Sequence, residues 1–273
     1  MRISALSLAL AGLIMVAPAA SRAADTSPGP AKSPLAPDWL VTVQFGPGLS
    51  PAYPGSSAYR PVPVPGLGVR RSDEPERFAA PDDGFGAPIL DTAGFRLGPV
   101  ANVLIPRWTT HQELNGLRKL STAIEIGAYA EYYPVDDMRL RGELRQGVYG
   151  HDGLVATFGS DFIRRAGAFL FSAGPRINLG TAAYANGYFD VTPDQALANG
   201  RVPPFQSHGG VTSAGFMTTA RYDFDPRWNA TVYGGLQRLT GSPGASPIPN
   251  ILGSRNQYSA GLMFARTFTI GGF

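Results

Sequence analysis

An alternation of apolar and polar residues with a period of two recurs from Trp39 towards the end of the chain, and it constrains the fold more than any other feature. In residues 39–46 (WLVTVQFG) and again in 94–105 (GFRLGPVANVLI), apolar side chains occupy most alternate positions. Neighbouring residues of a β-strand point to opposite faces of a sheet, so each segment has one apolar and one mixed face. The segments run for about 10 to 14 residues, whereas soluble strands cluster near about 5 or 6 and tilted membrane strands need about 9 to 11. These lengths predict an all-β fold, a single transmembrane antiparallel β-barrel, rather than a soluble sandwich.

The clearest pair of strands is 121–133 and 138–149, with a turn centred on Asp136. This turn places Glu131 opposite Arg141 and Tyr129 opposite Glu143, so that charged side chains share one face. A hydrated lumen is typically lined by such residues. We expect the lumen to be lined by Glu125, Tyr129, Glu131, Arg139, Arg141, Glu143 and Arg145. The favoured interpretation is cross-strand pairing that fixes the register, and the alternative is a charged constriction that selects solutes.

Short and long connections alternate in the second half of the chain. Short turns are expected near 135–137, 164–167 and 223–227, and long loops near 106–119, 181–209 and 240–257. Bacterial barrels have short periplasmic turns and longer outer loops. The expected strands are 39–48, 94–105, 121–133, 138–149, 154–163, 167–180, 211–224, 227–239 and 257–268. Both termini should be periplasmic, so the strand number is even; three strands in the Pro-rich region 58–92 give about twelve, and ten is the alternative.

Aromatic residues gather at the ends of these segments, where the aromatic girdles of membrane barrels lie. They are Trp39, Tyr132, Tyr133, Tyr149, Tyr222, Phe224 and Trp228.

The N-terminal region predicts export. Residues 1–23 have the features of a signal peptide, with Arg2 before an apolar run and small residues before a cleavage point after Ala23. Residues 24–38 are Pro-rich and are expected to form an extended periplasmic lead-in, which leaves 39–273 for the barrel. Charged residues make up only 16% of the chain, against about 25% in soluble domains, which suits a surface that faces lipid.

No catalytic residue, cofactor or metal site is predicted. The chain has no cysteine, and its net charge of +3 without a dense basic run does not indicate nucleic-acid binding. His111, His151 and His208 fall in loops or turns, where we expect them to be exposed, and Ser207-His208 lacks the surroundings of a hydrolase nucleophile. The acidic pairs 73–74 and 82–83 lack the spacing of a calcium loop.

Several short stretches, spread in order along the mature chain, resemble segments of a known protein family. They are 51–56 (PAYPGS), 113–117 (ELNGL) leading into 124–129 (IEIGAY), 184–196 (YANGYFDVTPDQA), and Trp228 followed by 246–248 (SPI) and 261–264 (GLMF). In these stretches the chain resembles the MipA/OmpV family of outer-membrane proteins (MltA-interacting protein-like). It departs from the family at Asp190, where Gly is usual, and in its extension to Phe273. Either Gly271-Gly272 forms a bulge or the last five residues hang free.

The loop between Tyr184 and Gly209 is longer than a passive connection needs, and Thr192-Pro193 is a typical helix start. We expect it either to plug the barrel mouth or to pack over the rim as a partner surface. The candidates for interaction are Tyr184, Tyr188, Phe189, Val191, Pro193 and Gln195.

The resemblance implies a non-enzymatic protein of the Gram-negative outer membrane, embedded in its lipid after signal-peptide cleavage. Family members are described as a scaffold between a lytic transglycosylase and a murein synthase, and as porin-like or adhesive surface proteins. We therefore expect a scaffold linked to peptidoglycan enzyme assembly, with murein hydrolases or synthases as periplasmic partners. The alternatives are a narrow porin-like channel for small solutes or a surface adhesin, and an outer-membrane hydrolase is a distant third.

Overall fold

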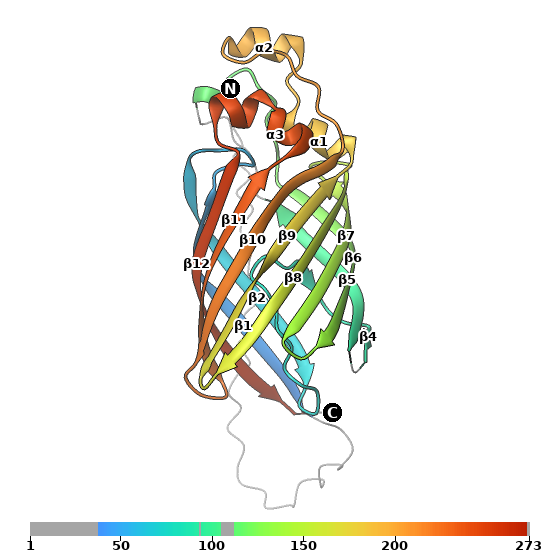
Figure 1. The fold of residues 1–273 in the computed structure, drawn as a ribbon, viewed down its shortest axis with the longest axis vertical. Coiled ribbons are helices and arrows are strands. Elements are labelled where there is room, and N and C mark those ends of the chain that lie inside the picture. Colours follow the sequence, from blue (N-terminus) through green and yellow to red (C-terminus); the bar gives the residue numbers. More distant parts are fainter. Residues whose placement is uncertain (1–37, 93, 105–111, 272–273) are drawn as a thin grey trace, which may run out of the picture. The chain divides into compact units, whose positions relative to one another are not determined.

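A computed structural model describes residues 38–92, 94–104 and 112–271, which form an antiparallel barrel (Figure 1). The predicted signal peptide, the lead-in before Asp38, His111 and Phe273 lie outside the described residues. The described residues form twelve strands, the number expected. They are β1 (Trp39–Pro51), β2 (Tyr59–Arg71), β3 (Phe85–Gly86), β4 (Leu90–Asp91), β5 (Phe95–Leu104), β6 (Ala123–Val135), β7 (Met138–Tyr149), β8 (Leu154–Ala166), β9 (Phe169–Gly180), β10 (Gly210–Asp223), β11 (Trp228–Leu239) and β12 (Asn256–Ile270).

The Pro-rich region does contain three strands, although β3 and β4 have only two residues each. The sheet order is β2-β1-β12-β11-β10-β9-β8-β7-β6-β5-β3, and β4 also pairs with β5. The first strand, β1, pairs with the last strand, β12, from Trp39↔Ile270 to Leu49↔Ala260. Because Thr269 and Ile270 pair with β1, the expectation that the last five residues hang free is wrong for these two.

Prolines determine where the hydrogen-bonded ladders of the barrel are interrupted. The pairing of β1 with β12 skips Pro47, which has no N–H to donate, so odd-numbered residues of β1 direct their N–H towards β12. Two directly opposite residues of an antiparallel pair direct their backbone N–H groups either both towards each other or both away from each other. The β2 residues opposite odd positions of β1 therefore point to the free edge of β2, and they are Pro61, Pro63 and Pro65. Among the described strands, the ladder stops at this edge, between β2 and β3.

Pro99 accounts for the short length of β3 and β4 in the same way. Both strands pair with β5, β3 at Val100 and Ala101 and β4 at Arg96 and Leu97, and the gap between them falls at Pro99. The region 85–91 is thus one interrupted edge strand, which completes a nearly closed barrel.

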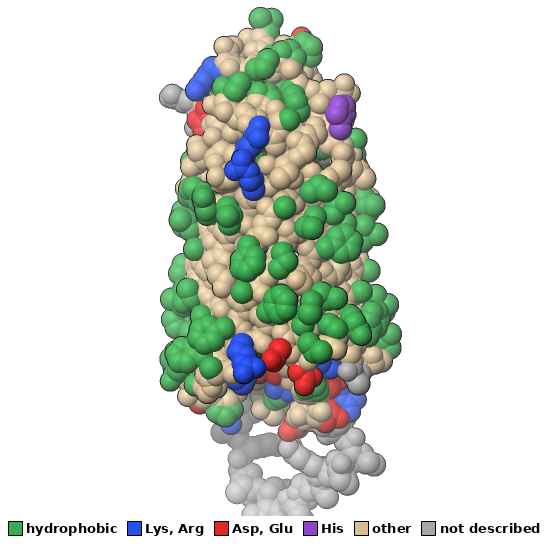
Figure 2. Space-filling view, viewed as in Figure 1, with side chains coloured by type: hydrophobic (Ala, Val, Ile, Leu, Met, Phe, Trp, Pro, Cys, Tyr) green, Lys and Arg blue, Asp and Glu red, His purple; other side chains and the backbone are tan. Residues whose placement is uncertain are grey.

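The apolar face predicted from the alternation points outward. Phe45 is 62% exposed and Phe162 is 61% exposed, as expected of side chains that face lipid rather than water. Figure 2 shows hydrophobic side chains over the middle of the visible wall and charged ones mainly at its lower end. The predicted girdle residues are exposed except Tyr133, which is half-buried.

The two ends of the barrel differ in their connections. The turn end carries Trp39, Ile270 and three short turns, and the loop end carries the long loops (Figure 1). Two of these turns lie at the predicted positions, whereas the turn predicted at 164–167 lies at 167–168, because β8 continues to Ala166. The helices η1 (Gln112–Leu114), α1 (Ala182–Phe189), α2 (Pro193–Asn199), α3 (Gly241–Ala245) and η2 (Ile248–Leu252) belong to the loop end. In the described part of the chain, no helix is long and apolar enough to cross a membrane.

Candidate functional site

The seven residues predicted to line the lumen lie on the inner face of β6 and β7. The predicted register is confirmed, since Tyr129 pairs with Glu143 and Glu131 pairs with Arg141. Arg139 is completely buried, and Glu125 is only 1% exposed. Charged side chains at this depth inside a protein require partners, and here they find one another.

Ion pairs connect the inner faces of these two strands. Arg141 Nη1 lies 2.6 Å from Glu131 Oε1, and Arg139 Nε lies 3.3 Å from the same oxygen. Arg145 Nε donates to Glu125 Oε2 at 2.9 Å, and its Nη1 also donates to Glu143. Cross-strand pairing of opposite charges therefore accounts for most of this wall.

Two further residues face the lumen, Asp82 and Asp83, and the sequence analysis did not place them there. The segment 72–84, between β2 and β3, enters the lumen, and we call it the plug segment. Asp83 accepts hydrogen bonds from Arg139 Nη2 at 2.6 and 2.7 Å. Asp82 accepts from Arg176 Nε at 2.8 Å, and Arg176 also donates to Asp161 at 2.7 Å. Asp161 and Arg176 are also buried on the inner face of β8 and β9, and the sequence analysis did not single them out. No local pattern shows that Asp82, 94 residues before Arg176, meets that guanidinium.

Further contacts fix the plug segment against the wall. The Arg139 guanidinium lies 5.3 Å from the Phe78 ring centre, a cation–π contact. The Gly84 amide donates to Glu143 at 3.1 Å, and a Cβ at Gly84 would lie 2.4 Å from Val100 Cγ2, so only glycine fits. The cavity left among the plug, Arg139, Arg141 and Arg176 is about 10 Å³, at most the space of one water.

On other strands, apolar side chains also fill the lumen. Met217, Tyr233 and Met263 are buried together, with Val64 packed against them. They lie on β10, β11, β12 and β2, whereas the ion pairs described above lie on β6 to β9, and Arg96 of β5 adds a further pair with Glu131 at 3.3 Å. The described barrel is therefore packed at this level rather than open.

His151 is a correction to the expectation of exposed loop histidines. It lies in a turn, as predicted, but is only 7% exposed, because α1 places the rings of Tyr184 and Tyr188 at 5.3 and 5.7 Å from it. Its Nδ1 accepts from the Gly153 amide at 3.1 Å, so the hydrogen resides on Nε2, 3.1 Å from Glu125 Oε1. Burial of the neighbouring Tyr184 at the same place raises the pKa of its phenol above the ordinary value. His208 is exposed, as predicted.

The six interaction candidates do not form one surface. Tyr188, Phe189 and Val191 are buried in apolar clusters of the loop end, and Tyr184 packs against one of them. The predicted helix start is confirmed, because Thr192 and Gln195 form a capping box with Pro193 in the first turn of α2. Among the six, Pro193 alone is exposed, and Gln195 is half-buried. The loop packs over the rim rather than entering the lumen (Figure 1).

The surroundings of Ser207 and the arrangement of acidic and His side chains bear on the metal and hydrolase hypotheses. They contain no group of three or more His, Asp or Glu side chains that could hold a metal ion. The Ser207 hydroxyl lies 3.3 Å from the Ser242 hydroxyl, and the adjacent His208 uses its backbone amide, not its ring, to bond Ser242.

Comparison with known proteins agrees with this fold. The sequence profile of the family described as MltA-interacting protein MipA matches residues 43–268. No curated protein sequence matches the chain. Solved structures similar to it include an outer-membrane channel from Pseudomonas putida F1, with 11% identity, a TM-score of 0.45, and coverage of 89% of this chain and 100% of that one. A bacterial polysaccharide outer-membrane secretin has 9% identity, a TM-score of 0.39, and coverage of 85% and 98%. Neisserial surface protein A has 7% identity, a TM-score of 0.26, and coverage of 84% and 97%.

These structural likenesses are too distant to bear on activity, but the family match spans most of the chain. The match, the outward apolar belt and the long antiparallel strands lead to one conclusion. The chain belongs to the MipA family and is a β-barrel protein of the Gram-negative outer membrane.

Proposed function

We propose that this protein is a non-enzymatic scaffold in the outer membrane, whose turn end faces the periplasm and engages murein enzymes there. The observation that carries the proposal is the plug segment, which Arg139 and Arg176 hold in the lumen through Asp83 and Asp82. A lumen filled in this way favours a structural role over transport. The family description names an interaction with MltA, and the short turns supply the surface for such a partner.

A binding measurement tests the scaffold role. The purified barrel in detergent is titrated with a lytic transglycosylase of the MltA type, and we expect an affinity in the range of about 1 µM. Charge reversal at exposed turn residues, Asp136→Lys with Arg227→Glu, should weaken binding about tenfold. The matched control at the loop end, Arg201→Glu, should leave binding unchanged. Equal binding by all three proteins, or binding by none, would contradict the proposal.

A narrow channel is the second candidate, and one observation favours it. The inner wall carries alternating carboxylates and guanidinium groups, and side-chain ion pairs of Asp82 and Asp83 hold the plug segment against it. If these pairs break, the lumen gains a charged path of the kind that selects ions.

Planar-bilayer recording separates the two candidates. We expect no steady conductance from the wild-type barrel and discrete steps from the double variant Asp82→Asn with Asp83→Asn. The control Asp73→Asn, which removes an exposed partner of Arg71, should remain silent. Steady conductance by the wild type would favour the channel and count against the closed scaffold.

A further inference from the structure

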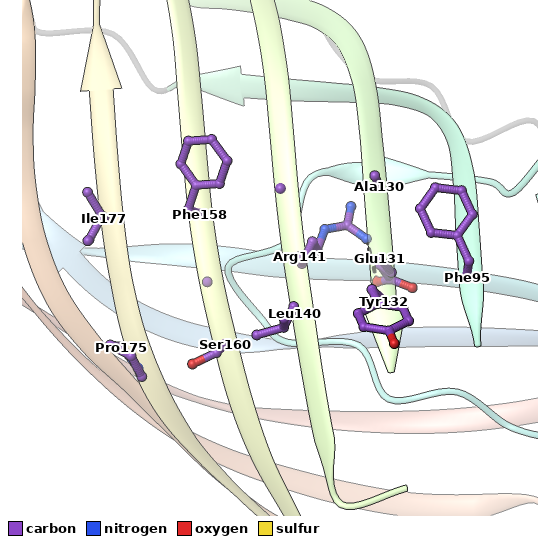
Figure 3. A pocket seen from close by; sticks show the side chains of 12 residues that line it. Phe95, Ala130, Glu131, Tyr132, Leu140, Arg141, Phe158, Ser160, Pro175 and Ile177 are labelled. Atoms are coloured by element: carbon purple, nitrogen blue, oxygen red, sulfur yellow. Dashed lines mark hydrogen bonds and ion pairs between the residues drawn. The ribbon is translucent and has the colours of Figure 1, made fainter. Parts of the chain in front are cut away.

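The outer wall carries an apolar groove of about 430 Å³ across β5 to β9. Its size falls within the range of small-molecule pockets, about 300 to 1,000 Å³. The walls include Phe95, Tyr132, Leu140, Phe158 and Ile177, all of which face outward. Figure 3 shows these side chains around a floor that contains Ala130 and Ser160.

Small residues create the groove. Gly142 has no side chain, and a Cβ there would lie 3.3 Å from the Phe158 ring, so any larger residue would grow into the space beside that ring. Ala130 pairs directly with Gly142, and Gly142 pairs with Phe158. Ala130 and Gly142 therefore form a row of two short residues beside the Phe158 ring, and Ser160 lies in the neighbouring row, opposite Leu140.

A proline makes the wall locally irregular beneath the same groove. The pairing of β8 with β9 is interrupted between Gly159↔Arg176 and Phe162↔Ala173, where Pro175 has no N–H to donate. The Ser160 carbonyl accepts instead from Arg176 Nη1 at 3.1 Å. Arg176 thus satisfies the open carbonyl from inside, and the groove floor presents no unpaired backbone group at this point.

The groove offers hydrocarbon surface and no free charge. Glu131 and Arg141 border it, but their charged groups point into the lumen and bond each other at 2.6 Å (Figure 3). The surrounding wall belongs to the outward apolar belt, including Phe162, so the medium that reaches the groove is lipid. The occupant that matches such a surface is an acyl chain.

A cationic group lies on the same face of β8, nearer the turn end. Arg164 follows Phe158, Ser160 and Phe162 at alternate positions, and it lies about 13 Å beyond Ser160 along the strand. Its side chain is 79% exposed and pairs with an exposed carboxylate, Asp137, at 3.1 Å. Exposed pairs of this kind contribute little, so an anionic headgroup can replace Asp137.

We propose that the groove binds an acyl chain of a phospholipid of the periplasmic leaflet, with the phosphate held at Arg164. The turn end supplies this leaflet assignment, because Arg164 adjoins the short turn between β8 and β9. The bound lipid is an ordered part of the barrel surface, distinct from the lipid that surrounds the rest of the belt.

Two outward glycines provide a matched test. Gly142→Leu fills the groove, whereas Gly234→Leu adds the same side chain to the belt on β11, where the nearest atom to a new Cβ is 3.9 Å away. Delipidated protein in detergent is titrated with phosphatidylglycerol and observed by native mass spectrometry. We expect one retained lipid for the wild type and Gly234→Leu, and about tenfold weaker retention for Gly142→Leu. Arg164→Gln should abolish the preference for phosphatidylglycerol over phosphatidylcholine.

Each other outcome overturns the proposal. Equal retention by both glycine variants would show that the groove holds no specific lipid. In a parallel titration with lipid A, retention of lipid A by a wild type that does not retain phosphatidylglycerol would assign the groove to the opposite leaflet. Dimers that disappear only in Gly142→Leu would make this face a contact between copies of the chain. An unchanged headgroup preference in Arg164→Gln would remove the role of that residue.

Discussion

Single residues decide whether the charged lumen is stable, and Arg139 is the central one. Its guanidinium lies 2.6 Å from Asp83, 3.3 Å from Glu131 and 3.4 Å from Asp161, and no part of its side chain reaches solvent. Arg139→Leu would leave these carboxylates without a shared counter-charge. We expect a loss of about 3 to 5 kcal/mol in the free energy of unfolding, measured by urea titration with gel mobility as the readout.

The control for this prediction is Arg164→Leu, which removes one member of an exposed pair and should change the unfolding midpoint very little. If Arg139→Leu unfolds at the same urea concentration as the wild type, the ion pairs of the lumen do not stabilise the barrel.

His151 is the residue that links the ionic wall to the loop end. It bonds Glu125 below and contacts Tyr184 and Tyr188 of α1. His151→Ala removes the hydrogen bond and leaves space beneath both rings, which should destabilise the α1 region by about 1 to 3 kcal/mol. Limited proteolysis should then cut within 181–209 faster than in the wild type. His151→Gln retains a donor for Glu125 and should be cut at an intermediate rate; identical rates for all three proteins would contradict this role.

At the scale of elements, β2 is an edge strand protected by its own sequence. The free edge of β2 lacks backbone N–H donors at three positions, Pro61, Pro63 and Pro65. An exposed sheet edge with free donors otherwise pairs with strands of other chains. The triple change of these prolines to alanine adds donors at the edge without altering the bonds to β1. We expect the triple variant to form a larger oligomer than the wild type, measured by analytical ultracentrifugation in detergent. Pro47→Ala adds one donor inside the sheet, towards β12, and should have the same mass in solution as the wild type; a triple variant that also keeps this mass would show that the prolines do not protect this edge.

At the scale of the whole molecule, closure depends on the junction of β1 and β12. Removal of residues 271–273 leaves every described pair of β12 in place, so the barrel should form and shift on a gel when heated. Removal of residues 266–273 deletes the partners of Trp39 to Val43, from Ile270 to Arg266, and should abolish that shift. A shift that is lost already on removal of 271–273 would mean that the end of the chain is needed for assembly independently of strand pairing.

Much of the fold followed from local pattern. The period-two alternation located the strands, gave the outward face, and together with the turn at Asp136 fixed the pairing of Glu131 with Arg141. These properties are local, because successive side chains alternate between faces whatever the rest of the chain does. The same reasoning placed the charged residues of β6 and β7 inside the lumen, and the capping pattern at Thr192 gave the start of α2.

Only the tertiary structure decided how the interior is filled. The sequence showed Asp82 and Asp83 only as an acidic pair without the spacing of a calcium loop. They meet Arg176 and Arg139 because the plug segment returns through the lumen before it reaches β3. His151 is buried because α1, more than thirty residues later, packs over it. Partner choice among buried charges depends on which segments share a closed space, and that space exists only once distant strands have joined. The sequence by itself determined the wall of the barrel, and the tertiary structure determined what lies inside it and over its loop end.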